Sequence, residues 1–192
     1  MPLVHGKTTI TNILKEKLKA SVVDADKIAR QLSKKGNKYY DAIVKCFGPN
    51  VLDENRELNR KYLANIVYND QEKIKELNML TEEYVLPEIK KQVISEEQQG
   101  VVLMDVPLLI ESGLNDMCNV VVSTIASMEA KLNRIKNRDN ITKQEAEDRI
   151  KIQPENEFYI KNSDYVIENN EEEMQEIIKQ VENIIEKIGG VI

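Results

Sequence analysis

Short continuous runs of apolar residues alternate along the chain with longer stretches in which apolar residues recur every three or four positions. The continuous runs are typical of strands buried on both faces of a parallel sheet, and they lie at 21–24, 101–105, 119–123 and 165–167. The helical periodicity predicts helices at 8–18, 25–32, 39–47, 127–137, 142–152 and 171–188. This alternation predicts an α/β fold in which helices cover both faces of a parallel sheet.

A longer helical block, from about residue 59 to residue 98, interrupts the alternation. Pro87 lies inside this block and predicts a kink or a break there. We interpret residues 33–98 as a helical insertion on the sheet. The sequence predicts one domain with no repeats and no linker.

The composition and charge limit which kinds of ligand and partner we expect. The net charge is −6, which argues against non-specific nucleic-acid binding, because such binding needs clustered Lys and Arg. A polyanionic ligand would need a local basic pocket, which indicates a small molecule. No apolar run approaches the roughly 20 residues that span a bilayer, and the start does not look like a signal peptide. With two widely spaced cysteines, we expect a cytoplasmic protein with reduced thiols and no membrane contact.

The start of the first predicted helix has the chemistry of a phosphate-binding loop. Gly6-Lys7-Thr8-Thr9 corresponds to the second half of the pattern G-x-x-x-x-G-K-[ST]. In that pattern the free backbone N–H groups at the helix start cradle phosphate, the lysine binds the β- and γ-phosphates, and the hydroxyl binds Mg²⁺. The alternative is a threonine-rich helix start with an exposed lysine, which the tetrapeptide alone does not exclude.

The first half of that pattern is absent. Its first glycine would lie where the sequence has Met1, so the interior strand that delivers the loop is missing. Unpaired neighbours would cost roughly 1–3 kcal/mol per buried polar group, against a total stability of about 5–15 kcal/mol. We therefore expect that the sheet closes up, that Met1–Val4 form a stub, that another segment fills the position, or that the natural start lies elsewhere. We favour a truncated or mis-started chain.

Two carboxylates follow the first predicted strand. Asp24 ends that strand and Asp26 lies two residues later, where ligands bind in open α/β sheets. Asp26 could accept a proton from an attacking hydroxyl, and Asp24 could orient Mg²⁺. The alternative is helix capping by either acid, with Asp26 paired to Arg30 one turn later.

Several motifs occur together in a fixed order. The segment 22–30 reads VVDADKIAR, the segment 57–68 reads ELNRKYLANIVY, and the segment 105–114 reads DVPLLIESGL. Arg138-Asp139 and the segment 164–169, DYVIEN, follow. These motifs resemble those of dephospho-coenzyme A kinases, and the resemblance runs from about residue 6 to residue 185. One departure is Thr81-Glu82-Glu83, where the family usually reads T-H-P.

The resemblance implies an activity and a P-loop nucleotide-kinase-like fold. In that fold residues 137–155 form a small lid, and the core comprises about 1–32, 99–136 and 156–192. The family transfers the γ-phosphoryl group of ATP to the ribose 3′-hydroxyl of dephospho-coenzyme A, the last step of coenzyme A biosynthesis. It implies ATP, Mg²⁺ and small-molecule substrates. We also expect a monomer or weak homo-oligomer that binds no nucleic acid and no membrane. The alternatives are a remnant that binds nucleotide or dephospho-coenzyme A without turnover, and another small-molecule P-loop kinase.

The resemblance also assigns roles to residues. It implies that Asp26, Lys7 and Arg138 are catalytic, and that Asp26 and Arg30 contact the acceptor. The predicted nucleotide-binding residues are Gly6, Lys7, Thr8, Thr9, Arg138 and Asn169. The predicted metal ligands are Thr8, Asp24 and Asp105.

Three groups of residues keep alternative interpretations. Pro107, Leu108 and Leu109 would form an apolar wall near the acceptor, and the two leucines could equally pack in the core. Arg134 and Arg138 lie four residues apart, so they share a helix face and attract a polyphosphate, or they form a solvated basic face. Asn169 would lie on the adenine side of the nucleotide, or it is a turn residue.

Overall fold

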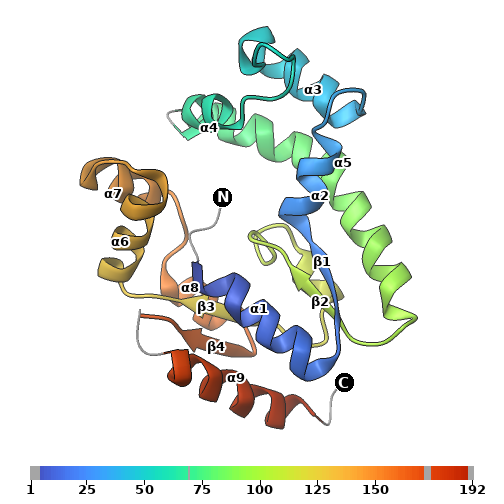
Figure 1. Ribbon diagram of the computed structural model, residues 1–192, viewed down its shortest axis with the longest axis vertical. Coiled ribbons are helices and arrows are strands. Elements are labelled where there is room, and N and C mark those ends of the chain that lie inside the picture. Colours follow the sequence, from blue (N-terminus) through green and yellow to red (C-terminus); the bar gives the residue numbers. More distant parts are fainter. Residues whose placement is uncertain (1–4, 69, 171–173, 190–192) are drawn as a thin grey trace. The chain divides into compact units, whose positions relative to one another are not determined.

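The computed structural model describes the backbone of residues 5–68, 70–170 and 174–189, and their side chains from residue 9 onward (Figure 1). The chain divides into two compact units. One comprises Val22–Val106, and the other comprises Met1–Ser21 together with Pro107–Ile192. Each unit is described by itself below, and the division into core, insertion and lid remains a prediction.

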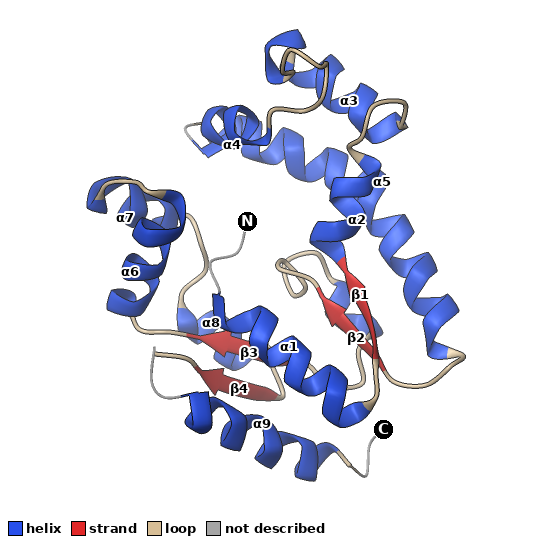
Figure 2. Ribbon diagram, in the orientation of Figure 1, coloured by secondary structure: helices blue, strands red, loops and turns tan. Residues whose placement is uncertain are grey.

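The first unit is built on a pair of strands. β1 (Ser21–Asp24) pairs with β2 (Val102–Asp105), and Figure 2 shows both arrows pointing the same way. β1 passes directly into α2 (Ala25–Leu32), the helix predicted at these residues. Val23 and Ile28 are buried, so the strand and the helix both contribute apolar side chains to the core of this unit.

A helical group completes the first unit, as the long periodic block predicts. It contains α3 (Lys38–Phe47), a short 3-10 helix (Pro49–Val51), α4 (Arg60–Tyr68) and α5 (Gln71–Glu97). Asp70 caps α5 by accepting hydrogen bonds from two backbone N–H groups of its first turn. α5 packs against α2, α3 and α4. It continues through Pro87, so the alternative of a break at this proline is wrong.

The second unit has a strand pair of its own. β3 (Val122–Ile125) and β4 (Tyr165–Glu168) are parallel, with Val122 opposite Tyr165. α1 (His5–Leu18) packs on α9 (Met174–Ile188), which also packs on β4 (Figure 1). α8 (Asn156–Lys161) contacts both strands and was not predicted. Ile167 and Val181 are fully buried and mark the core of this unit.

One capped helix ends before residue 140 and another begins shortly after it. α6 (Met128–Asp139) is capped by Ser127, and α7 (Lys143–Lys151) begins with a capping box between Thr142 and Glu145. Asn140 ends α6 in the left-handed conformation, which asparagine tolerates better than most residues. A small apolar cluster joins the two helices, and its buried members are Ile135, Ala146 and Ile150.

The predicted α/β fold with parallel strands is confirmed, but its sheet is divided. The described residues form two separate two-stranded sheets, β1–β2 and β3–β4, and no strand among them links the two. Met1–Val4, on which the expected stub falls, lie outside the described residues. Met174 is the first described residue of α9, and the predicted helix residues 171–173 also lie outside them.

Candidate active site

The acids predicted as metal ligands end two paired strands. Asp24 is the last residue of β1, and Asp105 is the last residue of β2. Because the strands run in the same direction (Figure 2), both acids lie at the carboxyl edge of this sheet, where ligands bind in such folds. Asp24 also caps α2, since its Oδ1 accepts a hydrogen bond from the Lys27 N–H at 2.9 Å. The capping reading is therefore confirmed for Asp24, and its other carboxylate oxygen is not used by the cap.

Asp26 lies in the first turn of α2 and is half-buried, whereas Arg30, one turn later, is exposed. The ion pair expected between them is not among the ion pairs of the described residues. The Asp26 carboxylate is therefore not held in an ion pair with Arg30. A carboxylate in this position remains suited to accept a proton, as the sequence predicts.

The structure adds a residue that the sequence reasoning did not select. Arg60 begins α4, and its Nη2 donates hydrogen bonds to the Ser33 hydroxyl and, at 3.4 Å, to the Arg30 carbonyl oxygen. Burial and the nearby charge of Arg30 lower the pKa of Arg60, while Tyr39 and Asp26 partly oppose that shift. Asp26, Arg30 and Arg60 thus form one charged cluster. The only sequence signal for Arg60 was its place in the motif at 57–68.

The predicted phosphate-binding segment begins a helix. Gly6 and Lys7 lie in the first turn of α1, which begins at His5, so their backbone N–H groups are among the free donors of the helix start. Thr8 and Thr9 follow directly in the same helix. The side chains of Lys7 and Thr8 lie outside the described residues. Their roles therefore remain predictions.

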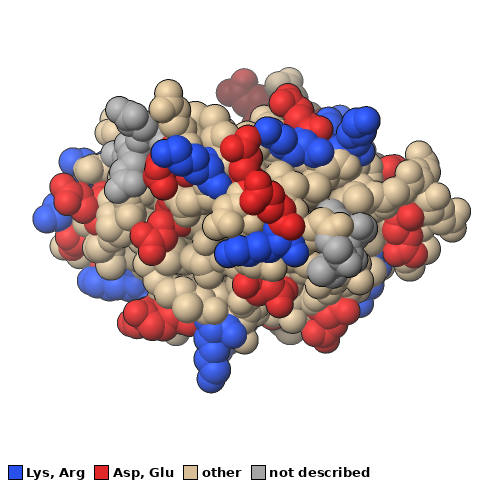
Figure 3. All heavy atoms as spheres, turned by 90° about the horizontal axis from the view of Figure 1, so that it is seen from below, with Lys and Arg blue, Asp and Glu red and all other residues tan. Residues whose placement is uncertain are grey.

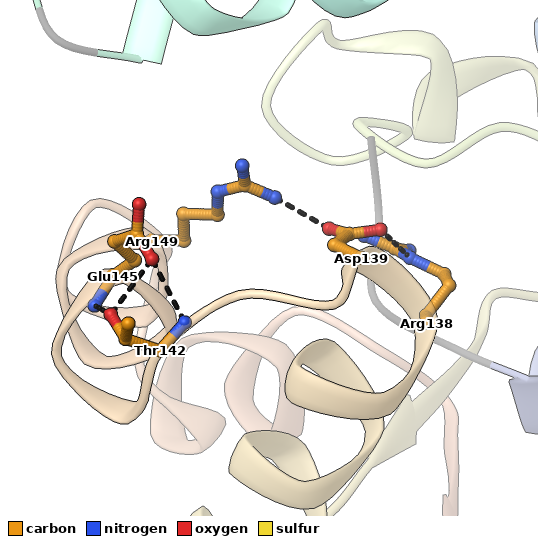
Figure 4. Close-up of polar contacts among 5 residues, drawn as sticks. All are labelled: Arg138, Asp139, Thr142, Glu145 and Arg149. Carbon is orange, nitrogen blue, oxygen red and sulfur yellow. Dashed lines mark hydrogen bonds and ion pairs between the residues drawn. The ribbon is translucent and has the colours of Figure 1, made fainter.

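Arg138 belongs to a three-residue charge cluster at the end of α6 (Figure 4). Its Nε and Nη2 each donate to one oxygen of Asp139 at 2.7 Å, and Arg149 of α7 donates to Oδ2 of the same carboxylate. The hydrogen bonds and charge of Arg138, together with Arg149, lower the pKa of Asp139, although burial partly opposes them. One carboxylate therefore orients two guanidinium groups, and the role of Arg138 toward phosphate remains a prediction.

Arg134 is not part of a solvated basic face. Its Nη2 donates hydrogen bonds to the backbone oxygen of Asn169 at 2.8 Å and to the Asn169 Oδ1 at 2.6 Å. Asn169 follows β4 and is only 3% exposed. Because the guanidinium can only donate, it fixes the side-chain oxygen toward Arg134 and directs the amide nitrogen away from it. Arg134 thus orients the residue predicted to lie beside adenine.

The predicted apolar wall begins the second unit. Leu108 is 49% exposed, so the core-packing reading is wrong for this leucine. Pro107 and Leu109 are half-buried, and the Leu109 carbonyl accepts hydrogen bonds from the Leu114 N–H at 3.0 Å and from the Ser112 hydroxyl at 3.2 Å. A contact of these three residues with the acceptor remains a prediction.

On the face drawn in Figure 3, basic and acidic side chains are interspersed, and neither kind gathers into a patch. None of the helices in the described ranges is both long and apolar enough to cross a membrane. In the same ranges, no group of three or more His, Cys, Asp or Glu side chains could hold a metal ion, so a metal at Asp24 and Asp105 would need ligands of another kind.

Comparison with known proteins decides the family. A family model described as dephospho-CoA kinase matches residues 3–175. The chain belongs to the dephospho-CoA kinase family. It is 38% identical over 186 residues to the dephospho-CoA kinase of Fusobacterium nucleatum, and the match covers 97% of this chain and 94% of that protein. A dephospho-CoA kinase of Saccharomyces cerevisiae is 34% identical, with 95% and 78% of the two chains covered.

Solved structures agree with this assignment. The chain resembles a dephospho-CoA kinase from Campylobacter jejuni with a TM-score of 0.65 and 25% identity, over 97% of this chain and 94% of that one. A Thermus thermophilus protein gives a TM-score of 0.72 at 23% identity, over 95% and 91% of the two chains. The second likeness supports the fold alone. The family resemblance and the α/β fold expected from the sequence are both confirmed.

Proposed function

We propose that this chain is an ATP-dependent dephospho-CoA kinase, which transfers the γ-phosphoryl group of ATP to the ribose 3′-hydroxyl of dephospho-CoA. The observation that carries the proposal is the family match, which extends over residues 3–175. The position of Asp26 beside the carboxyl edge of the β1–β2 sheet supports it. The reaction would complete coenzyme A biosynthesis. We further propose that the protein acts in the cytoplasm as a monomer or weak homo-oligomer.

The chemistry assigns one task to each group. The 3′-hydroxyl oxygen forms a bond to the γ-phosphorus while the bond from that phosphorus to the ADP oxygen breaks, and Asp26 accepts the hydroxyl proton. The helix start from Gly6 to Thr9 and the side chain of Lys7 hold the ATP phosphates. Arg138 stabilises the charge on the transferred group. Asn169 binds on the adenine side.

Magnesium fits the residues that are present. Asp105 and the oxygen of Asp24 that the helix cap leaves unused are hard ligands of the kind Mg²⁺ prefers, and Mg²⁺ usually keeps few protein ligands and several waters. We propose that these acids, with the Thr8 hydroxyl, hold Mg²⁺. When bound, the ion neutralises charge on the β- and γ-phosphates.

The proton-accepting role of Asp26 can be tested by one amide substitution. Asp26→Asn keeps the shape of the side chain but removes its basicity, so we expect the rate of coenzyme A formation to fall by about 10²–10⁴-fold. Asp41→Asn is the matched control, because Asp41 is an exposed acid on α3 of the same unit and should leave the rate unchanged. Circular dichroism checks that both variants are folded.

The outcomes separate the role from the function. A folded Asp26→Asn variant with unchanged turnover would show that Asp26 is not the proton acceptor. A folded wild-type chain that forms no coenzyme A would contradict the kinase function itself. An acceptor panel containing AMP and adenosine distinguishes this reaction from that of another small-molecule kinase.

A further inference from the structure

The most informative charged group outside the predicted site is Arg60. It lies at the start of α4, yet its side chain reaches the C-terminal end of α2 in the same unit. There the Ser33 hydroxyl accepts a hydrogen bond from Arg60 Nη2 and donates one to the Arg30 carbonyl oxygen at 3.2 Å. Ser33 is only 4% exposed. The guanidinium of Arg60 is therefore held at a fixed place beside the helix that carries Asp26 and Arg30.

This placement brings two cations close together. Arg60 and Arg30 are both exposed as whole residues, yet partial burial and the charge of Arg30 lower the pKa of Arg60, so the two guanidinium groups repel each other weakly. Asp26 is the one carboxylate that opposes the shift, so the cluster holds two positive charges against one negative charge. A bound anion would convert this repulsion into attraction, and its oxygens would take the donors that Arg60 does not use internally.

The donors of Arg60 suit a phosphate. Its hydrogen bonds within the described residues both come from Nη2, so its Nε and Nη1 groups have no hydrogen-bond acceptor in that part of the chain. Arginine presents these groups as a rigid planar fork that matches two phosphate oxygens, whereas lysine offers one point charge. The cluster is thus better suited to a phosphate or diphosphate than to a single carboxylate or a neutral group.

We propose that Arg60, together with Arg30, binds the diphosphate of dephospho-CoA. This assignment rests on the proposed function, in which Asp26 accepts the proton of the ribose 3′-hydroxyl. The diphosphate is joined to the 5′-carbon of that same ribose, so it must lie only a few bonds from the group that Asp26 contacts. Arg60 would then hold the acceptor by its diphosphate, while Asp26 accepts the proton of the 3′-hydroxyl on the same ribose.

A structural role for Arg60 makes a different prediction. A guanidinium group beside the C-terminal end of α2 also stabilises that helix, because it binds the helix's last carbonyl groups and interacts favourably with the helix dipole. If this were its whole role, loss of Arg60 would lower stability without selectively weakening one ligand. The test must therefore compare two ligands and the stability of the same variants.

Binding of dephospho-CoA to the whole chain, without ATP, can be measured by titration calorimetry. We expect Arg60→Gln to weaken this binding by about tenfold or more, since a hydrogen-bonded charge is lost, while ATP binding stays within about threefold of wild type. Lys61→Gln is the matched control, because Lys61 is the next residue of α4, is exposed, and loses the same charge. It should leave both affinities within about threefold.

A second variant keeps the test decisive if Arg60→Gln does not fold. Arg60→Lys keeps the charge but lacks the planar fork, so its dephospho-CoA affinity should lie between those of wild type and Arg60→Gln. Thermal melting shows which variants are folded. A folded Arg60→Gln or Arg60→Lys variant with the dephospho-CoA affinity of wild type would overturn the proposal, as would equal losses for dephospho-CoA and ATP.

This measurement does not depend on turnover. A wild-type chain that binds dephospho-CoA but makes no coenzyme A would contradict the proposed function, yet the loss of binding in Arg60→Gln would still support the assignment of Arg60. The reverse result, turnover in wild type with unchanged acceptor binding in Arg60→Gln, would contradict the assignment and leave the function supported.

Discussion

Replacing Arg134 by glutamine removes the side chain that holds the turn after β4. Arg134 Nη2 donates to the backbone oxygen and the Oδ1 of Asn169, at 2.8 and 2.6 Å, and Asn169 is almost fully buried. A buried acceptor that loses its donor costs about 1–3 kcal/mol. The shorter glutamine can restore at most one of the two bonds, and Arg134 itself is only half-buried. We therefore expect Arg134→Gln to lower the free energy of unfolding by about 2 kcal/mol.

Urea unfolding followed by circular dichroism measures this loss. Lys136→Gln is the matched control, because Lys136 lies on the same helix, is exposed, and loses the same charge; it should change stability by no more than about 0.5 kcal/mol. Hydrogen exchange gives a local readout, since the Asn169 N–H donates to the Ile125 carbonyl at 2.9 Å and should lose protection in Arg134→Gln. Equal unfolding midpoints for the two variants, with the Asn169 amide still protected, would refute the reasoning.

Two further predictions follow from the charge cluster of Figure 4 and from the core. Asp139→Asn leaves Arg138 and Arg149 facing each other, so it should lower stability by about 1–2 kcal/mol in denaturant unfolding at neutral pH. Because its arginine partners keep the pKa of Asp139 below its ordinary value, the contribution of this carboxylate is complete above the unfolded-state pKa. This contribution is lost as the pH falls below about 4 toward the folded-state pKa. The difference in stability between wild type and Asp139→Asn should therefore shrink in acid. A difference that stays constant with pH would contradict this prediction. Val181→Ala removes fully buried apolar volume from α9 and should cost about 2 kcal/mol, whereas Met174→Ala, at a position that is 50% exposed, should cost less than half as much in the same assay.

The sequence predicted elements well where local signals agree with tertiary packing. Residues 25–32 form α2 with the predicted bounds, because an acid suited to capping precedes a periodic apolar face. The third strand was predicted at 119–123, but β3 runs from Val122 to Ile125. The prediction ended at Ser123, whereas the strand continues through Thr124 to the buried Ile125. Inside the strand, the Ser123 hydroxyl accepts a hydrogen bond from the Ser163 hydroxyl at 2.6 Å. That partner is 40 residues away in the sequence, so local pattern could not reveal it.

The candidate site shows the same limit. The strand-end positions of Asp24 and Asp105 followed directly from apolar runs that end in an acid. The roles of Arg60 and Arg134 depend instead on partners 27 and 35 residues away, which periodicity does not report. The six-residue helix α8 was missed for a related reason, since so short a helix has little stability of its own and forms through its contacts with β3 and β4.

The kinase function is tested most directly by the chemical identity of the product. The purified chain would be incubated with ATP, Mg²⁺ and dephospho-CoA, with Lys7→Ala as the control, and the product examined by phosphorus NMR. We expect a new phosphomonoester on the ribose 3′-oxygen, with the diphosphate of dephospho-CoA intact, and no such product with Lys7→Ala. A folded wild-type chain that leaves dephospho-CoA unchanged, or that places the phosphoryl group on another acceptor, would contradict the proposed function.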